Sequence, residues 1–197
     1  AAPWALNLVM HRSNPRRKED LRLAVKYRAP IVITALGSPS EAVDAVQSYG
    51  GKVYADVTTI EFARRAASAG VDGLALICCG AGGHTGQLSP FAFIDEVRQF
   101  FKGEIILSGA IANGRAVRAA QILGADYVYM GTRFIPTKES MAQPDYKAMV
   151  VSASGQDIIT SDAVTGVKAN WLKASLIQAG YDLNNMPPAA DINFLEA

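Results

Sequence analysis

Residues 52–78 read KVYADVTTIEFARRAASAGVDGLALIC, and this stretch decides the fold that the sequence predicts. Two apolar runs, Lys52–Val57 and Gly73–Cys78, flank a segment with helical spacing of its apolar residues. Near-continuous hydrophobicity is typical of strands covered on both faces, as in parallel sheets. Residues 58–61, TTIE, have the S/T-x-x-E form of a capping box, and Gly70 stands where a helix should end. The stretch therefore predicts a strand–helix–strand unit with parallel strands.

The same plan repeats through the first two-thirds of the chain. Six runs are expected to be strands: Ala5–Met10, Ile31–Leu36, Lys52–Val57, Gly73–Cys78, Ile105–Gly109 and Tyr127–Gly131. Between them, residues 38–41, SPSE, have the form of a second capping box, and Pro90 stands where the first turn of a helix tolerates proline. This alternation predicts an α/β fold with right-handed crossovers.

Six strand–helix units do not close a (β/α)8 barrel, which needs eight strands and typically about 250 residues. Two architectures remain: an open doubly wound sheet, or a TIM barrel whose first two strands and last helix lie outside this sequence. The glycine-rich loops described below favour the barrel, because phosphate sites in barrels are frequently built from the loops after the last two strands. We therefore predict an incomplete (β/α)8 TIM barrel.

The alternation stops after Phe134. Pro144–Ala153 and Asn170–Ala179 have helical spacing, no strand is expected after either, and Asn184–Ala190 is expected to be a loop because it contains two prolines. We divide the chain into a barrel portion, residues 1–137, and a helical appendage, residues 138–197, packed over the barrel mouth.

Composition argues against several classes of function. The chain has 19 basic and 18 acidic residues, whereas nucleic-acid binding needs a concentrated basic surplus. No apolar run approaches the roughly 20 residues that span a bilayer, and residues 1–4 do not resemble a secretory signal. The adjacent Cys78 and Cys79 fit two buried thiols better than a disulfide framework or a zinc site. We expect a cytoplasmic protein with no membrane partner and no bound metal.

Three of the expected strands end in glycine-rich loops, on the face where barrels carry their chemistry. Residues 80–86 read GAGGHTG and hold His84, which can act as a general base near neutral pH. Residues 108–115, SGAIANGR, lead into a helix whose N-terminus can hold a phosphate. Residues 129–134 read YMGTRF. Each loop alone also fits an ordinary turn, but together they predict a phosphate-bearing ligand beside a reactive histidine.

These loops, together with LGAD at residues 123–126, resemble the nitronate monooxygenase (2-nitropropane dioxygenase) family in order and spacing. The resemblance covers most of residues 4–170 and implies an FMN-containing TIM barrel, with the strands here corresponding to the third through eighth. His84 matches the catalytic histidine of the family. The residues that correspond to cofactor-binding positions are Asn7, Gly83, Ser108, Gly109, Ala110, Ile111, Gly131 and Thr132.

Two positions depart from the family pattern. Ala110 stands where a second glycine is common, a change that a phosphate loop should tolerate. Asp56 stands where some members have a lysine near the flavin, and a carboxylate there would disfavour negative charge on the reduced cofactor. Two further residues have open roles: His11 fits a surface loop, and Arg133 fits a partner of either the FMN phosphate or a structural carboxylate.

The resemblance implies oxidation of alkyl nitronates, and of nitroalkanes, by O2 to a carbonyl compound and nitrite. His84 would remove the α-proton of a nitroalkane or hydrogen-bond the nitro group of a nitronate. Two alternatives stay open: an FMN-containing enoyl-acyl-carrier-protein reductase that consumes NAD(P)H, and a non-catalytic flavin- or phosphate-binding module. The physiological substrate and the oligomeric state, a homo-oligomer included, also stay open.

Overall fold

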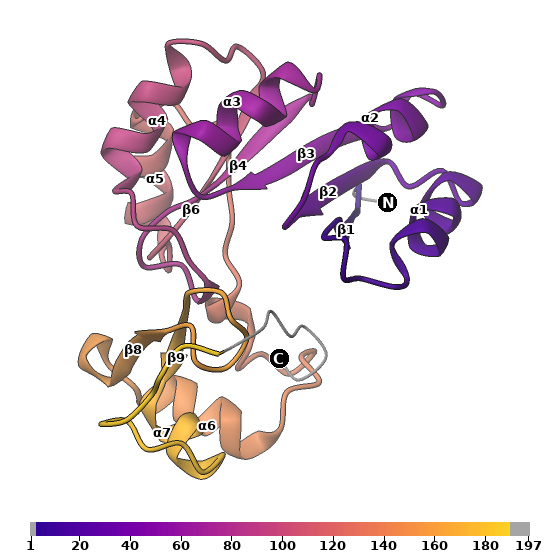
Figure 1. Cartoon of the computed structure of the whole chain (residues 1–197). Coiled ribbons are helices and arrows are strands. Elements are labelled where there is room, and N and C mark those ends of the chain that lie inside the picture. Colours follow the sequence, from indigo (N-terminus) through magenta and orange to yellow (C-terminus); the bar gives the residue numbers. More distant parts are fainter. Residues whose placement is uncertain (1–2, 190–197) are drawn as a thin grey trace.

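The computed structural model describes residues 3–189 of the chain. Its main feature is a parallel six-stranded sheet in the order β1-β2-β3-β4-β6-β7 (Figure 1). These strands are β1 (Ala5–Val9), β2 (Ile31–Ala35), β3 (Lys52–Val57), β4 (Gly73–Ile77), β6 (Glu104–Ser108) and β7 (Tyr127–Val128). The strand order follows the chain without the reversal that defines a doubly wound sheet. The predicted partial barrel is therefore confirmed, and all six expected strands are present.

Five helices connect these strands and cover one face of the sheet: α1 (Arg17–Lys26), α2 (Ser40–Gln47), α3 (Ile60–Ser68), α4 (Pro90–Arg98) and α5 (Gly114–Ile122). The main core lies between the helices and the sheet, where Leu74 and Ile105 of the strands and Phe93 of α4 are fully buried. No helix within residues 3–189 is both long and apolar enough to cross a membrane.

The opposite face of the sheet, which is the interior side of a barrel, carries a smaller apolar cluster that includes Ile33, Ala75 and Ile106. Its polar floor lies at the beginning of the strands. There, Lys52 Nζ lies 2.9 Å from a carboxylate oxygen of Glu104, and the Tyr54 hydroxyl donates to the same carboxylate. The carboxyl ends of the strands are thus left for the loops that carry chemistry.

The two predicted capping boxes do not form as expected. Thr59 caps α3, with its Oγ1 accepting from Phe62 N–H at 3.2 Å, one residue later than predicted. Pro39 precedes α2 and has no side-chain acceptor, while Glu41 lies 3.5 Å from Arg17 of α1. Glu41 therefore pairs with another helix and does not form the expected capping box.

The segment after the sheet begins with the short helix η1 (Thr132–Phe134) and continues with α6 (Pro144–Ser152), η2 (Gly155–Asp157), β8 (Ile158–Ser161), β9 (Ala169–Leu172) and α7 (Lys173–Gln178). Figure 1 shows β8, β9, α6 and α7 gathered on one side of the molecule. The helix expected over Pro144–Ala153 is confirmed. Residues 184–189 contain no helix or strand, as predicted, and Ala190 lies outside the described residues.

The predicted all-helical character of this segment is wrong. Residues 170–172 belong to β9, and the expected helix begins only at Lys173. β9 lies between β8 and a two-residue strand, β5 (Gly83–His84), in an antiparallel sheet. Helical spacing could not reveal this, because β9 is a strand through its pairing with β8 and with β5, and β5 lies more than 80 positions earlier in the chain.

Candidate active site

The three glycine-rich loops predicted from the sequence meet at the carboxyl ends of β4, β6 and β7. Ala110 N–H, after β6, donates to the Gly80 carbonyl, after β4, at 3.0 Å. Gly82 packs directly against Thr132, after β7, and a Cβ at residue 82 would overlap the threonine hydroxyl. The structure thus brings together the segments that were expected to share one ligand.

The loop after β6 has a backbone that glycine makes accessible. Gly109 has φ +120°, and a Cβ there would lie 2.7 Å from the Cys79 carbonyl oxygen. Ala110 follows with φ +55°, a left-handed conformation that is uncommon for residues with a side chain. Within residues 3–189, the N–H groups of Gly109 and Ile111 have no recorded backbone or side-chain acceptor. These two N–H groups lie on either side of the Ala110 N–H, which donates to the Gly80 carbonyl, and they remain as donors for an anion.

The loop after β7 leaves open space in front of its backbone. Gly131 precedes η1, and a Cβ built on it would meet no atom within 4 Å. The same is true of Gly83 in the His84 loop. Thr132 and Arg133 are exposed in η1. A ligand can therefore approach the main chain at both loops.

His84 lies in β5, within the loop that follows β4. The base of this loop is closed by a hydrogen bond from Thr85 Oγ1 to the Cys78 carbonyl at 3.1 Å. Its tip pairs with β9, where His84 is opposite Ala169. Partial burial lowers the pKa of His84 from its usual value, which favours the neutral imidazole at pH 7.

Asp56 is a buried carboxyl group on the interior side of the sheet, in register with Ala75 of β4. Its Oδ1 atom is buried and has no hydrogen-bond partner within residues 3–189. Burial raises the pKa of Asp56 to about 7. Burial also raises the pKa of Tyr129, at the end of β7, and the nearby Asp56 charge adds to that rise. A buried oxygen without a partner is rare in native proteins and marks a place where a ligand donor can bind.

Replacing Asp56 by asparagine should make the stability of the protein less dependent on pH. The Asp56 carboxyl ionises near pH 7 in the native protein and near pH 3.8 in the unfolded chain. Its contribution to the free energy of unfolding is therefore fully present below about pH 4 and is lost as the pH rises to 7. This difference in pKa between the native and unfolded states corresponds to at most about 4 kcal/mol in the free energy of unfolding. Urea unfolding should therefore show Asp56→Asn more stable than wild type at pH 8 and equal to it at pH 4. An equal difference at both pH values would contradict this assignment.

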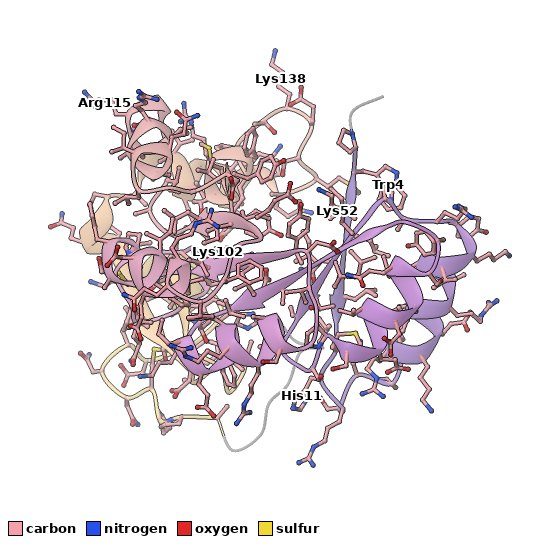
Figure 2. All side chains as sticks on the ribbon, turned by 90° about the horizontal axis from the view of Figure 1, so that it is seen from above. Trp4, His11, Lys52, Lys102, Arg115 and Lys138 are labelled. Carbon is pink, nitrogen blue, oxygen red and sulfur yellow. The ribbon has the colours of Figure 1, made fainter. Side chains whose placement is uncertain are left out.

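Two residues singled out from the sequence lie away from the three loops. Asn7 is on edge strand β1, in register with Ile33 on the interior side of the sheet. His11 lies in the turn after β1, where its Nδ1 is 2.7 Å from the Ser13 hydroxyl. Figure 2 shows His11 well apart from Arg115, which lies near the start of α5. The structure thus keeps both residues at the β1 side of the sheet.

The remaining sequence expectations have mixed outcomes. Ser108 ends β6 and is buried beside Ile77, its partner in register. Cys78 is buried, and burial raises its pKa to about 12, but the prediction of a second buried thiol is wrong because Cys79 is exposed. Within residues 3–189, no group of three His, Cys, Asp or Glu side chains gathers as a metal site would.

Sequence reasoning missed the residues that reach the His84 loop from the C-terminal segment. Asn170 donates from its Nδ2 to the Ala81 carbonyl at 2.8 Å, and Thr160 donates to the Asn170 Oδ1. A cavity of about 500 Å³ lies beside them, lined also by Cys79 and Lys168, but His84 does not line it. The signal was present as β-branched Ile158-Ile159-Thr160, which favours a strand.

Comparisons with known proteins agree with this arrangement. Residues 4–193 match the family described as nitronate monooxygenase. A probable nitronate monooxygenase of Staphylococcus haemolyticus is 28% identical over 185 residues, which cover 87% of this chain and 52% of that protein. The chain spans about half the length of the curated relatives it matches.

Solved structures show the same fold. FabK from Thermotoga maritima is similar with a TM-score of 0.81 and 28% identity, over 92% of this chain and 59% of that one. A nitroalkane oxidase from Streptomyces ansochromogenes is similar with a TM-score of 0.79 and 22% identity, over 86% of this chain and 61% of that one.

Proposed function

Because the chain belongs to the nitronate monooxygenase family, we propose that it forms the FMN-binding part of an enzyme that oxidises alkyl nitronates with O2. The products would be a carbonyl compound and nitrite, and neutral nitroalkanes would be further substrates. The observation that carries the proposal is the meeting of three glycine-rich loops beside His84 at the carboxyl ends of the strands. This is where barrels of this architecture carry their active sites.

The loops fit a phosphate-bearing cofactor. The backbone N–H groups of Gly109 and Ile111, which have no protein acceptor within residues 3–189, would hold the FMN phosphate together with Gly131 and Thr132. The open space at Gly83 leaves room for the ring system beside His84. Bound FMN supplies the electron acceptor, and the protein supplies placement and electrostatics. Ser108 would support the loop through packing, and Asn7 would contact the cofactor from β1 on the interior side of the sheet, away from the phosphate loops.

His84 would carry the proton chemistry. Its neutral imidazole can accept the α-proton of a nitroalkane, or donate its N–H to a nitro oxygen of a nitronate. The lowered pKa of His84 keeps that neutral form available at pH 7. Asp56 would face the cofactor from the interior side, since its Oδ1 has no partner within the described part of the chain.

We assign the segment after residue 137 a covering role. β9 pairs with the loop of His84 at the carboxyl ends of the strands. A cover at this place would exclude water from the site, and electrostatic interactions there would be stronger as a result. The division into residues 1–137 and 138–197 therefore separates cofactor binding from covering.

The test is anaerobic mixing of the FMN-loaded protein with an alkyl nitronate while the flavin absorbance is followed. Rapid bleaching is expected, with nitrite and a carbonyl compound formed when air is admitted. No bleaching with nitronate, followed by bleaching with NADH or NADPH, would replace the proposal with an enoyl-acyl-carrier-protein reductase. No bleaching with any of these would favour a non-catalytic flavin-binding module.

A further inference from the structure

The loop that carries His84 depends on the C-terminal segment for its conformation. Gly83 and His84 pair with Asn170 and Ala169, and Thr85 N–H donates to the Lys168 carbonyl at 3.1 Å. Three consecutive residues of the loop thus lie opposite three consecutive residues of the C-terminal segment. The loop cannot shift along β9 without breaking this register.

Asn170 adds a bond that backbone pairing does not supply. Its Nδ2 donates to the Ala81 carbonyl at 2.8 Å, three residues before His84. A carbonyl oxygen can only accept, so the amide nitrogen must face Ala81 and the amide oxygen must face the other way. Thr160 of β8 donates to that oxygen and fixes the orientation of the carboxamide. The position therefore needs a side chain with one donor and one acceptor.

The part of the loop around Gly83 needs support from outside, because the bond within the loop lies at its base, where Thr85 Oγ1 donates to the Cys78 carbonyl. Gly80 and Gly83 have φ of +81° and +72°, and glycine loses more conformational freedom on folding than any other residue. By contrast, β9 is firmly anchored. Ala169 and Leu172 are buried, and the Trp171 indole N–H donates to the Ser161 carbonyl at 3.1 Å. A strand with buried residues thus supports a glycine-rich loop.

We propose that Asn170 is a positioning residue for His84, with its carboxamide, oriented by Thr160, holding the Ala81 carbonyl and fixing the loop against β9. This inference rests on the proposed role of His84 in nitronate and nitroalkane oxidation. Asn170 acts on the reaction only through the place of the imidazole, where a misplacement of about 1 Å can cost a factor of about 10² in rate.

The test compares Asn170→Ala with Trp171→Phe in the FMN-loaded protein. Both variants lose a side-chain hydrogen bond of the same small sheet: the Asn170 bond goes to the His84 loop, whereas the Trp171 bond goes to Ser161. Asn170→Ala should lower kcat for a nitroalkane about 10- to 100-fold, with a smaller change in KM. Trp171→Phe should keep the wild-type kcat. Thr160→Val, which leaves Asn170 in place but removes its orienting donor, should fall between them.

A second measurement does not depend on activity. Nuclear magnetic resonance titration of His84 should show its pKa moving up toward the ordinary value of about 6.5 in Asn170→Ala, because a released loop exposes the imidazole. The His84 signal should titrate as in wild type in Trp171→Phe. An unchanged His84 titration in Asn170→Ala would overturn the proposal, and so would an equal loss of kcat in Asn170→Ala and Trp171→Phe.

The two proposals can fail separately. If the wild-type protein does not oxidise nitronates or nitroalkanes, the proposed function fails, and the His84 titration still decides whether Asn170 holds the loop. If wild type is active and Asn170→Ala has the same kcat and the same His84 titration, only the positioning role fails.

Discussion

Oxidation of a neutral nitroalkane should slow by about 10²- to 10⁴-fold when His84 is replaced by alanine, which is the usual contribution of a general base. A nitronate has already lost its α-proton and should be affected less. The variant should keep FMN, because the loops after β6 and β7 that would hold the phosphate do not include His84. Stopped-flow reduction with both substrates, measured on the same preparation, gives the two ratios.

The matched control is His11→Ala, since His11 lies after β1 and contacts Ser13. It should react like wild type.

The lowered pKa of His84 also predicts the pH dependence of nitroalkane oxidation by wild type. The rate should fall as the pH is lowered, with its midpoint below the ordinary histidine pKa of about 6.5. Similar small changes for nitroalkane and nitronate in His84→Ala would remove His84 from the proton-transfer step.

Gly109→Ala should have the largest effect on the cofactor site. The residue needs φ +120°, and its new Cβ would lie 2.7 Å from the Cys79 carbonyl oxygen. Backbone strain of this kind costs about 1–3 kcal/mol, and relief of the clash would displace the loop after β4 as well. We expect a lower free energy of unfolding in urea and at least a tenfold weaker FMN affinity, measured by flavin fluorescence.

Gly114→Ala is the control for this change, because Gly114 is the first residue of α5, five positions after Gly109. A Cβ there meets no atom within 4 Å, and its φ is not in the left-handed region. This variant should be as stable as wild type or more so by a few tenths of a kcal/mol. Tight FMN binding by Gly109→Ala would show that the loop after β6 does not form the phosphate site.

The sequence predicted those parts of the fold that local patterns determine. Apolar runs such as residues 73–78 were predicted to be strands. A strand of a parallel sheet that is covered on both faces is apolar at nearly every position, and this pattern is easy to identify. Gly70 and Gly124 end their helices with positive φ, as their positions indicated. The glycine loops were found for the same reason, since a backbone that must approach another chain segment excludes other residues.

The parts that could not be predicted depend on distant partners. β9 is a strand because β8 and the His84 loop bond to it, and residues 170–172 alone have spacing that also fits a helix. At the start of α2, Glu41 lies near Arg17 of the preceding helix, a contact that residues 38–41 alone do not reveal. Asn170 was invisible for this reason, since nothing in the local sequence links it to Ala81.

The pairing of β5 with β9 also has a consequence for the order in which the protein assembles. Each strand–helix unit forms from neighbours in the chain, so the parallel sheet can grow as a series of short loop closures. His84 pairs with Ala169 only when a loop of more than 80 residues closes. Such a closure costs more conformational entropy than the short closures of the parallel sheet. We therefore expect the parallel sheet to form before the candidate site, and a nascent chain that ends before residue 172 to carry His84 on a loop not yet paired with β9.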